Sequence, residues 1–274
     1  MTETNISALP DLTKEYALTA SQIADFQQNG HILLRNVASS DEVTAYRSVI
    51  TNAALAYNTE KRALAERDTY GKAFLQIMNL WRRDEGVRRF VLARRFARIA
   101  ADLLGVENVR IYHDQALYKE AGGGPTPWHQ DEYYWPLDTE KTITLWMPLV
   151  DASTEMGVMS FISTSQKLGF LGEFAISDES QAVFERMIAE KNLSVKPGVD
   201  MAAGDATFHY GWTLHNASGN STETMREVMT IIYFADGARI TSPTNSYQEN
   251  DRRSWLGGLQ PGELATSELN PALL

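Results

Sequence analysis

The chain after Gly105 consists of short apolar segments separated by turn-forming clusters, and this pattern constrains the fold more than any other feature. The segments VRIYHDQALYKE, KTITLWMPLVDA, ATFHYGWTLHN and VMTIIYFADGARI are rich in β-branched and aromatic residues, which favour strands. Clusters of Gly, Pro, Asp and Ser lie between them, as expected for turns. We therefore predict an all-β core from about residue 106 to 240.

Helical periodicity dominates the chain before this core. The run VRRFVLARRFARIAADLL, residues 87–104, predicts one strong helix that ends at Gly105. We expect the N-terminal helices to pack on the β core, so that residues 19–274 form a single domain. Residues 1–18 are polar and have no sustained periodicity, so we expect a flexible N-terminal tail there.

Composition excludes several classes of function. The 274 residues carry a formal net charge of -10, which repels polyanions and argues against a nucleic-acid partner. No apolar run approaches the roughly 20 residues that cross a bilayer, and the N-terminus lacks the features of a secretory signal. We therefore expect a cytoplasmic protein with no membrane partner. The chain has no cysteine, so nitrogen and oxygen atoms must supply the ligands of any metal.

The segment TPWHQDEYYW carries the most informative local motif, in which one residue separates His129 from Asp131. In an extended strand, residues two positions apart point to the same face, so this imidazole and carboxylate would converge. A second histidine from a distant strand would complete a 2-His-1-carboxylate triad, which leaves open positions on Fe(II). Taken alone, the motif also fits a surface turn.

A second segment, GDATFHYGWTLHNASGN, supplies the missing histidine. His215 is followed by a turn and, eleven residues later, by Arg226 at the start of an apolar strand. A hairpin of this length can return the arginine to the metal, where its planar fork could pair with a carboxylate. His209 is a rival third ligand; because the turn and the arginine follow His215, we assign His209 to packing or to support of the site. We expect His113 to be a satisfied core histidine.

These segments, with an arginine eleven residues after the second histidine, resemble the phytanoyl-CoA dioxygenase family over roughly residues 20 to 240. The resemblance implies a mainly β fold with flanking helices, built on a double-stranded β-helix, also called a cupin-like jelly roll. It also implies Fe(II), 2-oxoglutarate and O₂ as cofactor and co-substrates.

The resemblance assigns roles to individual residues. His129, Asp131 and His215 are similar to the iron ligands, and Arg226 to the residue that pairs with the distal carboxylate of 2-oxoglutarate. Further candidates for the co-substrate pocket are Thr126, Trp146, Ser218, Gln115 and Tyr118. The candidates for the substrate side are Tyr134, Trp135 and Lys72.

The reaction that the resemblance implies is oxidation of a C–H bond of a small organic molecule, most simply hydroxylation, with release of succinate and CO₂. Related halogenases lack the carboxylate that Asp131 supplies here, so desaturation and ring closure are the nearer variants. No basic cluster suits the phosphates of coenzyme A, and we expect a free small molecule as substrate. Two alternatives stay open: a cupin-like isomerase or hydrolase with the same ligands, and a non-catalytic protein that binds metal or 2-oxoglutarate. The sequence does not indicate the oligomeric state.

Overall fold

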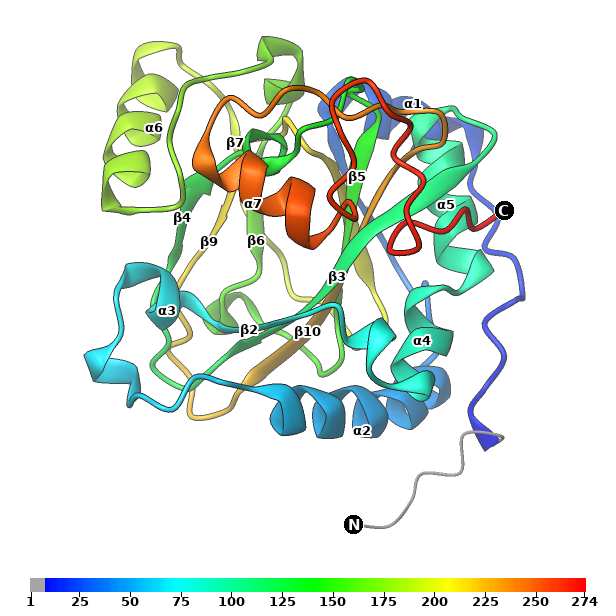
Figure 1. The fold of residues 1–274 in the computed structure, drawn as a ribbon. Helices are drawn as coiled ribbons and strands as arrows, with labels where there is room; N and C mark the ends of the chain where they lie inside the picture. The colour runs from blue at the N-terminus through cyan, green and yellow to red at the C-terminus, as the bar shows by residue number, and fades with distance from the viewer. Residues whose placement is uncertain (1–7) are drawn as a thin grey trace.

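Two antiparallel β-sheets face one another in the computed structural model, which describes residues 8–274. The larger sheet has the order β1-β8-β5-β10-β3-β2 and the smaller sheet the order β4-β9-β6-β7. The strands are β1 (His31–Leu34), β2 (Leu75–Met78), β3 (Val109–Lys119), β4 (Thr126–His129), β5 (Thr142–Pro148), β6 (Met159–Ile162), β7 (Val195–Lys196), β8 (Ala206–Tyr210), β9 (His215–Ala217) and β10 (Arg226–Ala235). This arrangement is the predicted double-stranded β-helix (Figure 1).

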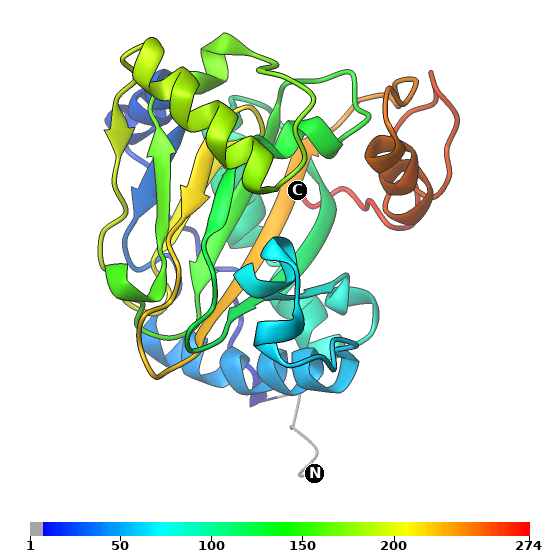
Figure 2. The same ribbon diagram turned by 90° about the vertical axis from the view of Figure 1, so that its left-hand side faces the viewer.

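Helices pack around the two sheets. They are α1 (Ala20–Asn29), α2 (Ser40–Tyr57), α3 (Thr69–Ala73), α4 (Glu85–Val91), α5 (Arg94–Leu104), α6 (Asp178–Glu190) and α7 (Ser246–Ser254). The helix α5 packs on β3, β5 and β10 of the larger sheet, whereas α6 packs beside β4 of the smaller one. Seen from the side, α7 projects from the opposite edge of the molecule to α6 and α1 (Figure 2).

The larger sheet separates an outer apolar core from the space between the sheets. On β5, Ile143, Leu145 and Met147 belong to the core that the helices cover, together with Met229 and Ile231 of β10. Because side chains alternate along a strand, the residues between them point to the inner side. The side chains on the inner face of the larger sheet are therefore available to line a cavity between the sheets.

The structure corrects the prediction of one helix over residues 87–104. Two helices, α4 and α5, meet at Ala93, whose ψ of 124° breaks the helical path. The break lets Phe90 contact Tyr46 of α2 with ring centroids 5.3 Å apart, while α5 turns its apolar face to the sheet. Tertiary packing on two different surfaces therefore overrides the continuous helical pattern.

The β-structure also includes two strands before the predicted core of residues 106–240, the first of them in the short apolar run HILLRNV that favours a strand. Two strands from the N-terminal third, β1 and β2, form the two edges of the larger sheet by pairing with β8 and β3. The short strand β2 has only four residues, too few for alternation to distinguish it from a loop.

Residues 8–18 differ from the expected flexible tail, of which residues 1–7 lie outside the described residues. Leu12 is buried. The Tyr46 hydroxyl donates to the carbonyl of Pro10 at 2.7 Å, and the Arg95 Nε donates to that of Lys14 at 2.6 Å. These contacts hold the segment against α2 and α5. Among the described residues, no helix has the length and apolar character that a membrane crossing requires.

Candidate active site

Three potential metal ligands converge between the sheets. His129 ends β4 and His215 begins β9, and the two residues are direct partners in the antiparallel pair. Asp131 opens the short 3₁₀ helix η4 (Asp131–Tyr134) just past the strand end, so it reaches the site from a turn and not from an extended strand. The ligand atoms of the three residues all lie within 4.8 Å of one another. Such a set can hold one metal ion.

Both histidines are oriented by their own backbone neighbours. The Nδ1 of His129 lies 2.8 Å from the carbonyl of Pro127, and the Nδ1 of His215 lies 2.8 Å from that of Thr213. A carbonyl accepts only, so each Nδ1 carries the proton and each Nε2 is a free lone pair. Burial, followed by the neighbouring His129 and His209, holds the pKa of His215 well below its usual range. Neutral imidazoles are the form that binds metals.

The two carboxylate oxygens of Asp131 have different surroundings. Oδ1 lies 3.5 Å from the Nε2 of His129 and 3.7 Å from that of His215. Oδ2 accepts from the Thr144 hydroxyl at 3.0 Å and lies 3.2 Å from the Nε2 of His209. Burial raises the pKa of Asp131, but the neighbouring histidine rings, His215 first and then His129 and His209, outweigh this effect and hold the pKa well below its usual range. The carboxylate is therefore ionised, with Oδ1 free for a metal.

His209 lies beside the three ligands without belonging to them. It is carried by β8 of the larger sheet, whereas His215 is on β9 of the smaller one. Its ring lies 4.3 Å from that of His215, and its Nε2 is directed to Asp131. The position agrees with a supporting role for His209, which stays a prediction.

Arg226, the first residue of β10, is a buried cation without a counter-ion. Its side chain is among the largest fully buried ones, and no acidic residue of the described chain forms an ion pair with it. One Nη donates to the carbonyl of Gly157, the Nε has no hydrogen-bond partner, and the guanidinium lies 5.1 Å from the ring centre of Trp146. Burial lowers the pKa of Arg226 to about 9. Burial of an unpaired charge destabilises the folded state, and a bound anion would offset this free-energy cost. This end of the cavity therefore favours an anion.

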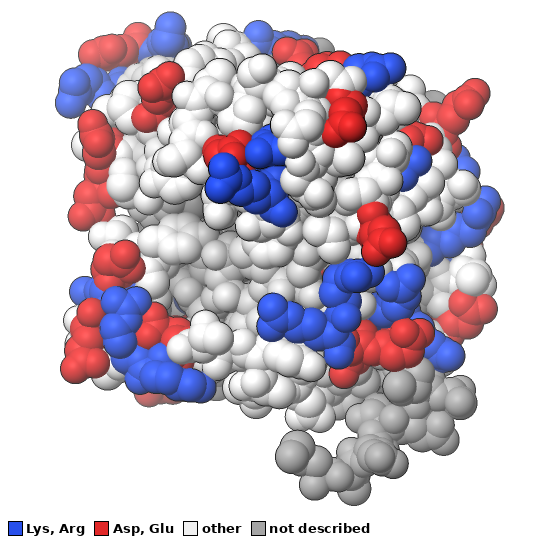
Figure 3. Space-filling model, in the orientation of Figure 1, with Lys and Arg blue, Asp and Glu red and all other residues white. Residues whose placement is uncertain are grey.

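The ligand triad and Arg226 share one cavity of about 510 Å³. This volume is typical of small-molecule sites, which span about 300–1,000 Å³. The predicted residues that line it, besides those four, are Thr126, Trp146, Gln115, Tyr134 and Trp135. The face of the molecule beside α7 is hollowed, and charged side chains gather around the hollow and not in it (Figure 3).

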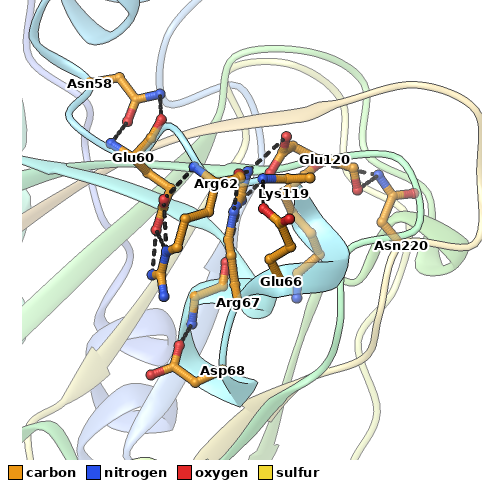
Figure 4. Close-up of polar contacts among 11 residues, drawn as sticks. Asn58, Glu60, Arg62, Glu66, Arg67, Asp68, Lys119, Glu120 and Asn220 are labelled. Carbon is orange, nitrogen blue, oxygen red and sulfur yellow. Dashed lines mark hydrogen bonds and ion pairs between the residues drawn. The ribbon is translucent and has the colours of Figure 1, made fainter.

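The strand end that carries Arg226 is fixed by a cluster of polar contacts (Figure 4). Arg226 pairs with Lys119 of β3 in the sheet. The Nδ2 of Asn220 donates to the carbonyls of Lys119 and Glu120 at 3.2 and 3.1 Å, and Arg67 forms an ion pair with Glu120. Burial, and then the charge of Arg226, lowers the pKa of Lys119 to about 6. Lys119 is therefore mostly neutral at pH 7, and Arg226 supplies the positive charge at this end.

Three residues proposed from the sequence do not line the cavity. Tyr118 lies on the outer face of β3, because the strand alternation that turns Gln115 inward turns Tyr118 outward, where its hydroxyl lies 2.9 Å from that of Thr51. Ser218 is exposed beyond the end of β9, and Ala217 lines the cavity in its stead. Lys72, on α3, contributes its backbone carbonyl to Gly124 and not its side chain to the cavity.

His113 also differs from expectation. It is buried, but it lines the cavity, and its Nδ1 has no hydrogen-bond partner among the described residues. Burial lowers the pKa of His113 to about 3, so the ring is neutral.

Other lining residues were not identified from the sequence. They are carried chiefly by α3, β2 and α7: Tyr70, Gln76, Met78, Tyr247, Asp251 and Trp255. For α7 the available signal was the pair of large aromatic residues, Tyr247 and Trp255, at the two ends of an otherwise polar segment.

Solved structures with the same fold include enzymes that use α-ketoglutarate. The non-haem carbocyclase SnoK from nogalamycin biosynthesis has 24% sequence identity and a TM-score of 0.77, over 94% of this chain and 97% of its own. The epimerase SnoN, in complex with Fe³⁺, α-ketoglutarate and nogalamycin RO, has 24% identity and a TM-score of 0.76, over 93% and 98% of the two chains. EctD from S. alaskensis, with 2-oxoglutarate and 5-hydroxyectoine, has 18% identity and a TM-score of 0.67, over 88% of each chain. At these identities the likeness establishes the fold alone.

Sequence comparison establishes the family. A probable α-ketoglutarate-dependent hypophosphite dioxygenase of Stutzerimonas stutzeri is 26% identical over 135 residues, which are 48% of this chain and 47% of that protein. The chain thus matches about half the length of this curated relative. The model of the family described as phytanoyl-CoA dioxygenase (PhyH) matches residues 26–228, most of the 274 residues. The chain therefore belongs to the phytanoyl-CoA dioxygenase family.

Proposed function

We propose that the protein is an Fe(II)- and 2-oxoglutarate-dependent oxygenase that oxidises a C–H bond of a small organic molecule and releases succinate and CO₂. The observation that carries this proposal is Arg226, a buried guanidinium whose Nε has no partner, and which has no acidic partner, among residues 8–274; it shares a cavity with three potential metal ligands. A dicarboxylate that binds a metal at one end and an arginine at the other satisfies both features.

The donor set fits iron in particular. Two neutral imidazoles and one carboxylate on the same side of a metal leave the remaining positions open, which is the arrangement of non-haem Fe(II) oxygenases. The oxidising power comes from the bound metal, 2-oxoglutarate and O₂.

The chain's own residues bind and orient the co-substrate. Arg226 can pair with both oxygens of the distal carboxylate through its planar fork. The ring of Trp146 lies under the guanidinium at 5.1 Å and restricts its direction. Thr144 and His209 hold Oδ2 of Asp131, which leaves one carboxylate oxygen for the metal.

We propose hydroxylation as the outcome of the C–H step. Relatives of the same fold are named as a carbocyclase and an epimerase, so the fold does not select the outcome. The product decides it: hydroxylation adds one oxygen atom, desaturation or ring closure removes two hydrogen atoms, and epimerisation leaves the composition unchanged.

The first test is anaerobic titration with Fe(II) and then 2-oxoglutarate. We expect a visible charge-transfer band of the chelate, lost in Asp131→Ala. In Arg226→Ala we expect 2-oxoglutarate to bind on the order of a hundredfold more weakly, since loss of a buried charge-assisted pair costs about 2–5 kcal/mol. Arg226→Lys should recover part of the affinity, because it restores the charge without the planar fork.

The control for this titration is Arg62→Ala, because Arg62 is an exposed arginine that pairs with Glu60 outside the cavity. Its titration should match that of the native protein. A native, iron-loaded protein that forms no band would contradict the proposal and favour a cupin-like isomerase or hydrolase.

A further inference from the structure

The cavity has a second region that the metal and Arg226 do not occupy. On β10, Arg226 and Ile232 lie six residues apart, or about 20 Å at the rise of a strand. Ile232 is the sheet partner of His113. On the side of the Ile232–His113 pair that is away from Arg226, the cavity is lined by residues of η4, α3 and α7 and the turn after α7. These residues are Tyr70, Tyr134, Tyr247, Asp251 and Trp255. We call the space between these five residues the outer chamber.

Asp251 is a buried carboxylate on the wall of the outer chamber. It is 9% exposed, and its Oδ2 accepts from the Tyr112 hydroxyl at 2.9 Å. No basic residue of the described chain forms an ion pair with it, because the two arginines next to it on α7, Arg252 and Arg253, both pair with Glu249. Burial raises the pKa of Asp251 to about 7. A carboxylate in this setting is stabilised in its charged form by a cation that enters the chamber.

Aromatic rings surround the same space. The rings of Tyr134 and Tyr247 meet edge to face, with centroids 5.4 Å apart. Trp255 packs against His113 at 5.4 Å, on the turn that follows Asp251. The negative faces of such rings attract ammonium groups, most strongly in a desolvated site.

The cavity contains little positive charge to oppose such a cation. Of the described residues that line it, Arg226 at the far end is the one lysine or arginine, and Asp68 on the α3 side adds a third carboxylate to Asp131 and Asp251. His113 is neutral. The same charge distribution disfavours acyl-CoA, phosphonates and other anions in the outer chamber.

We propose that the outer chamber binds an organic ammonium group, a protonated or quaternary amine on the substrate, with Asp251 as its counter-ion and Tyr134, Tyr247 and Trp255 around it. The identification of this cation as part of the substrate rests on the proposed oxygenase function; the ammonium site itself does not. The competing interpretation is that Asp251 is a protonated, purely structural partner of Tyr112.

The test uses three probes of similar size and different charge: benzyltrimethylammonium, benzyl alcohol and benzoate. Each is titrated by calorimetry into anaerobic protein loaded with Fe(II) and 2-oxoglutarate, at constant ionic strength. We expect the ammonium compound to bind at least about tenfold more tightly than the alcohol, as cation–π and ion-pair contacts in a partly desolvated site allow. Benzoate should bind more weakly than both.

Asp251→Asn keeps the size of the side chain and an acceptor for Tyr112 but removes the charge, and it should abolish the preference for the ammonium compound. Tyr247→Leu, at a side chain that is 46% exposed and therefore tolerant of change, should weaken ammonium binding several-fold, on the scale of one cation–π contact. The matched control is Asp102→Asn on α5, outside the cavity, which should leave all three affinities unchanged.

Three results would overturn the inference. Benzyl alcohol or benzoate could bind as tightly as benzyltrimethylammonium or more tightly, or the ammonium compound could fail to bind. The third is ammonium binding that is unchanged in both Asp251→Asn and Tyr247→Leu. The charge-transfer band separates this failure from failure of the proposed function. A band without ammonium binding removes the ammonium site alone, whereas Asp251-dependent ammonium binding without a band removes the oxygenase proposal alone.

Discussion

The carboxylate of Asp131 illustrates how neighbouring side chains hold a potential metal ligand in place. Thr144 and His209, which hold Oδ2, both come from the larger sheet, on β5 and β8. No motif in the sequence identifies Thr144, because its contact with Asp131 depends on how the two sheets are packed. That the triad and Arg226 meet in one cavity, in contrast, could be predicted, since residue type, order and spacing all carry the signal.

We predict that Thr144→Val weakens Fe(II) binding about tenfold, because residues that hold a metal ligand typically contribute 10–100-fold to metal affinity. Without this hydroxyl, Oδ2 loses one of its two donors and the carboxylate can rotate. Competition with a chromophoric chelator under anaerobic conditions measures the change. Thr207→Val is the matched control, because Thr207 is a buried threonine on β8 whose hydroxyl has no hydrogen-bond partner in the part of the chain that the structure describes. Equal iron affinity in the two variants would exclude the role of Thr144.

At the scale of elements, α7 is the part of the site that the sequence left unassigned. Its nine residues are mostly polar, which is typical of a surface helix. Two of them, Tyr247 and Asp251, nevertheless line the cavity. Gln248 ties it to the metal region: its Nε2 donates to the carbonyl of Tyr133 in η4 at 3.1 Å, and its Oε1 accepts from the amide of Thr244 at 2.9 Å. A contact of this kind depends on tertiary structure, which local periodicity does not encode.

Gln248→Ala should therefore loosen α7 selectively. Loss of these bonds costs about 1 kcal/mol, which accelerates amide exchange in residues 246–254 about fivefold if that helix opens as a local unit. Hydrogen–deuterium exchange read by mass spectrometry measures this, with β5 and β10 as internal references. Gln260→Ala, at an exposed position whose Nε2 bonds only to the nearby Gly258 carbonyl, should leave the helix unchanged. Uniform acceleration across the protein would show that α7 is not an independent unit.

At the scale of the whole molecule, the β core was predictable, and so was the edge strand β1, which lies in the short apolar run HILLRNV; the other edge strand, β2, was not. The apolar segments after Gly105 became the inner strands β3, β5, β8 and β10. The two features that were not predicted, the edge strand β2 and the break at Ala93, both lie in the N-terminal third. In this part of the chain, the structure of a short segment depends on how it packs against or pairs with the larger sheet, and therefore on residues distant in the sequence.

Metal and co-substrate should stabilise the whole fold, because the triad exists only in the folded state. At a hundredfold excess over Kd, a ligand stabilises by about 2.7 kcal/mol, or roughly 5–10 °C in Tm for a chain of this size. Anaerobic differential scanning calorimetry with Fe(II) and 2-oxoglutarate measures the shift. Asp131→Ala, which removes a ligand, should show no comparable increase. An equal shift in that variant would place the stabilising metal elsewhere.

The site is assembled from both sheets. Its histidine ligands are on the smaller sheet, whereas Arg226 and the two residues that hold Asp131 are on the larger one. A motion that separates the sheets by a few ångströms would leave His129, Asp131 and His215 together beside the smaller sheet, but it would withdraw Thr144, His209 and Arg226 from them while every strand is still paired. We therefore expect weakened binding of iron and 2-oxoglutarate to be an early sign that the two halves of the sandwich have separated, ahead of any loss of secondary structure.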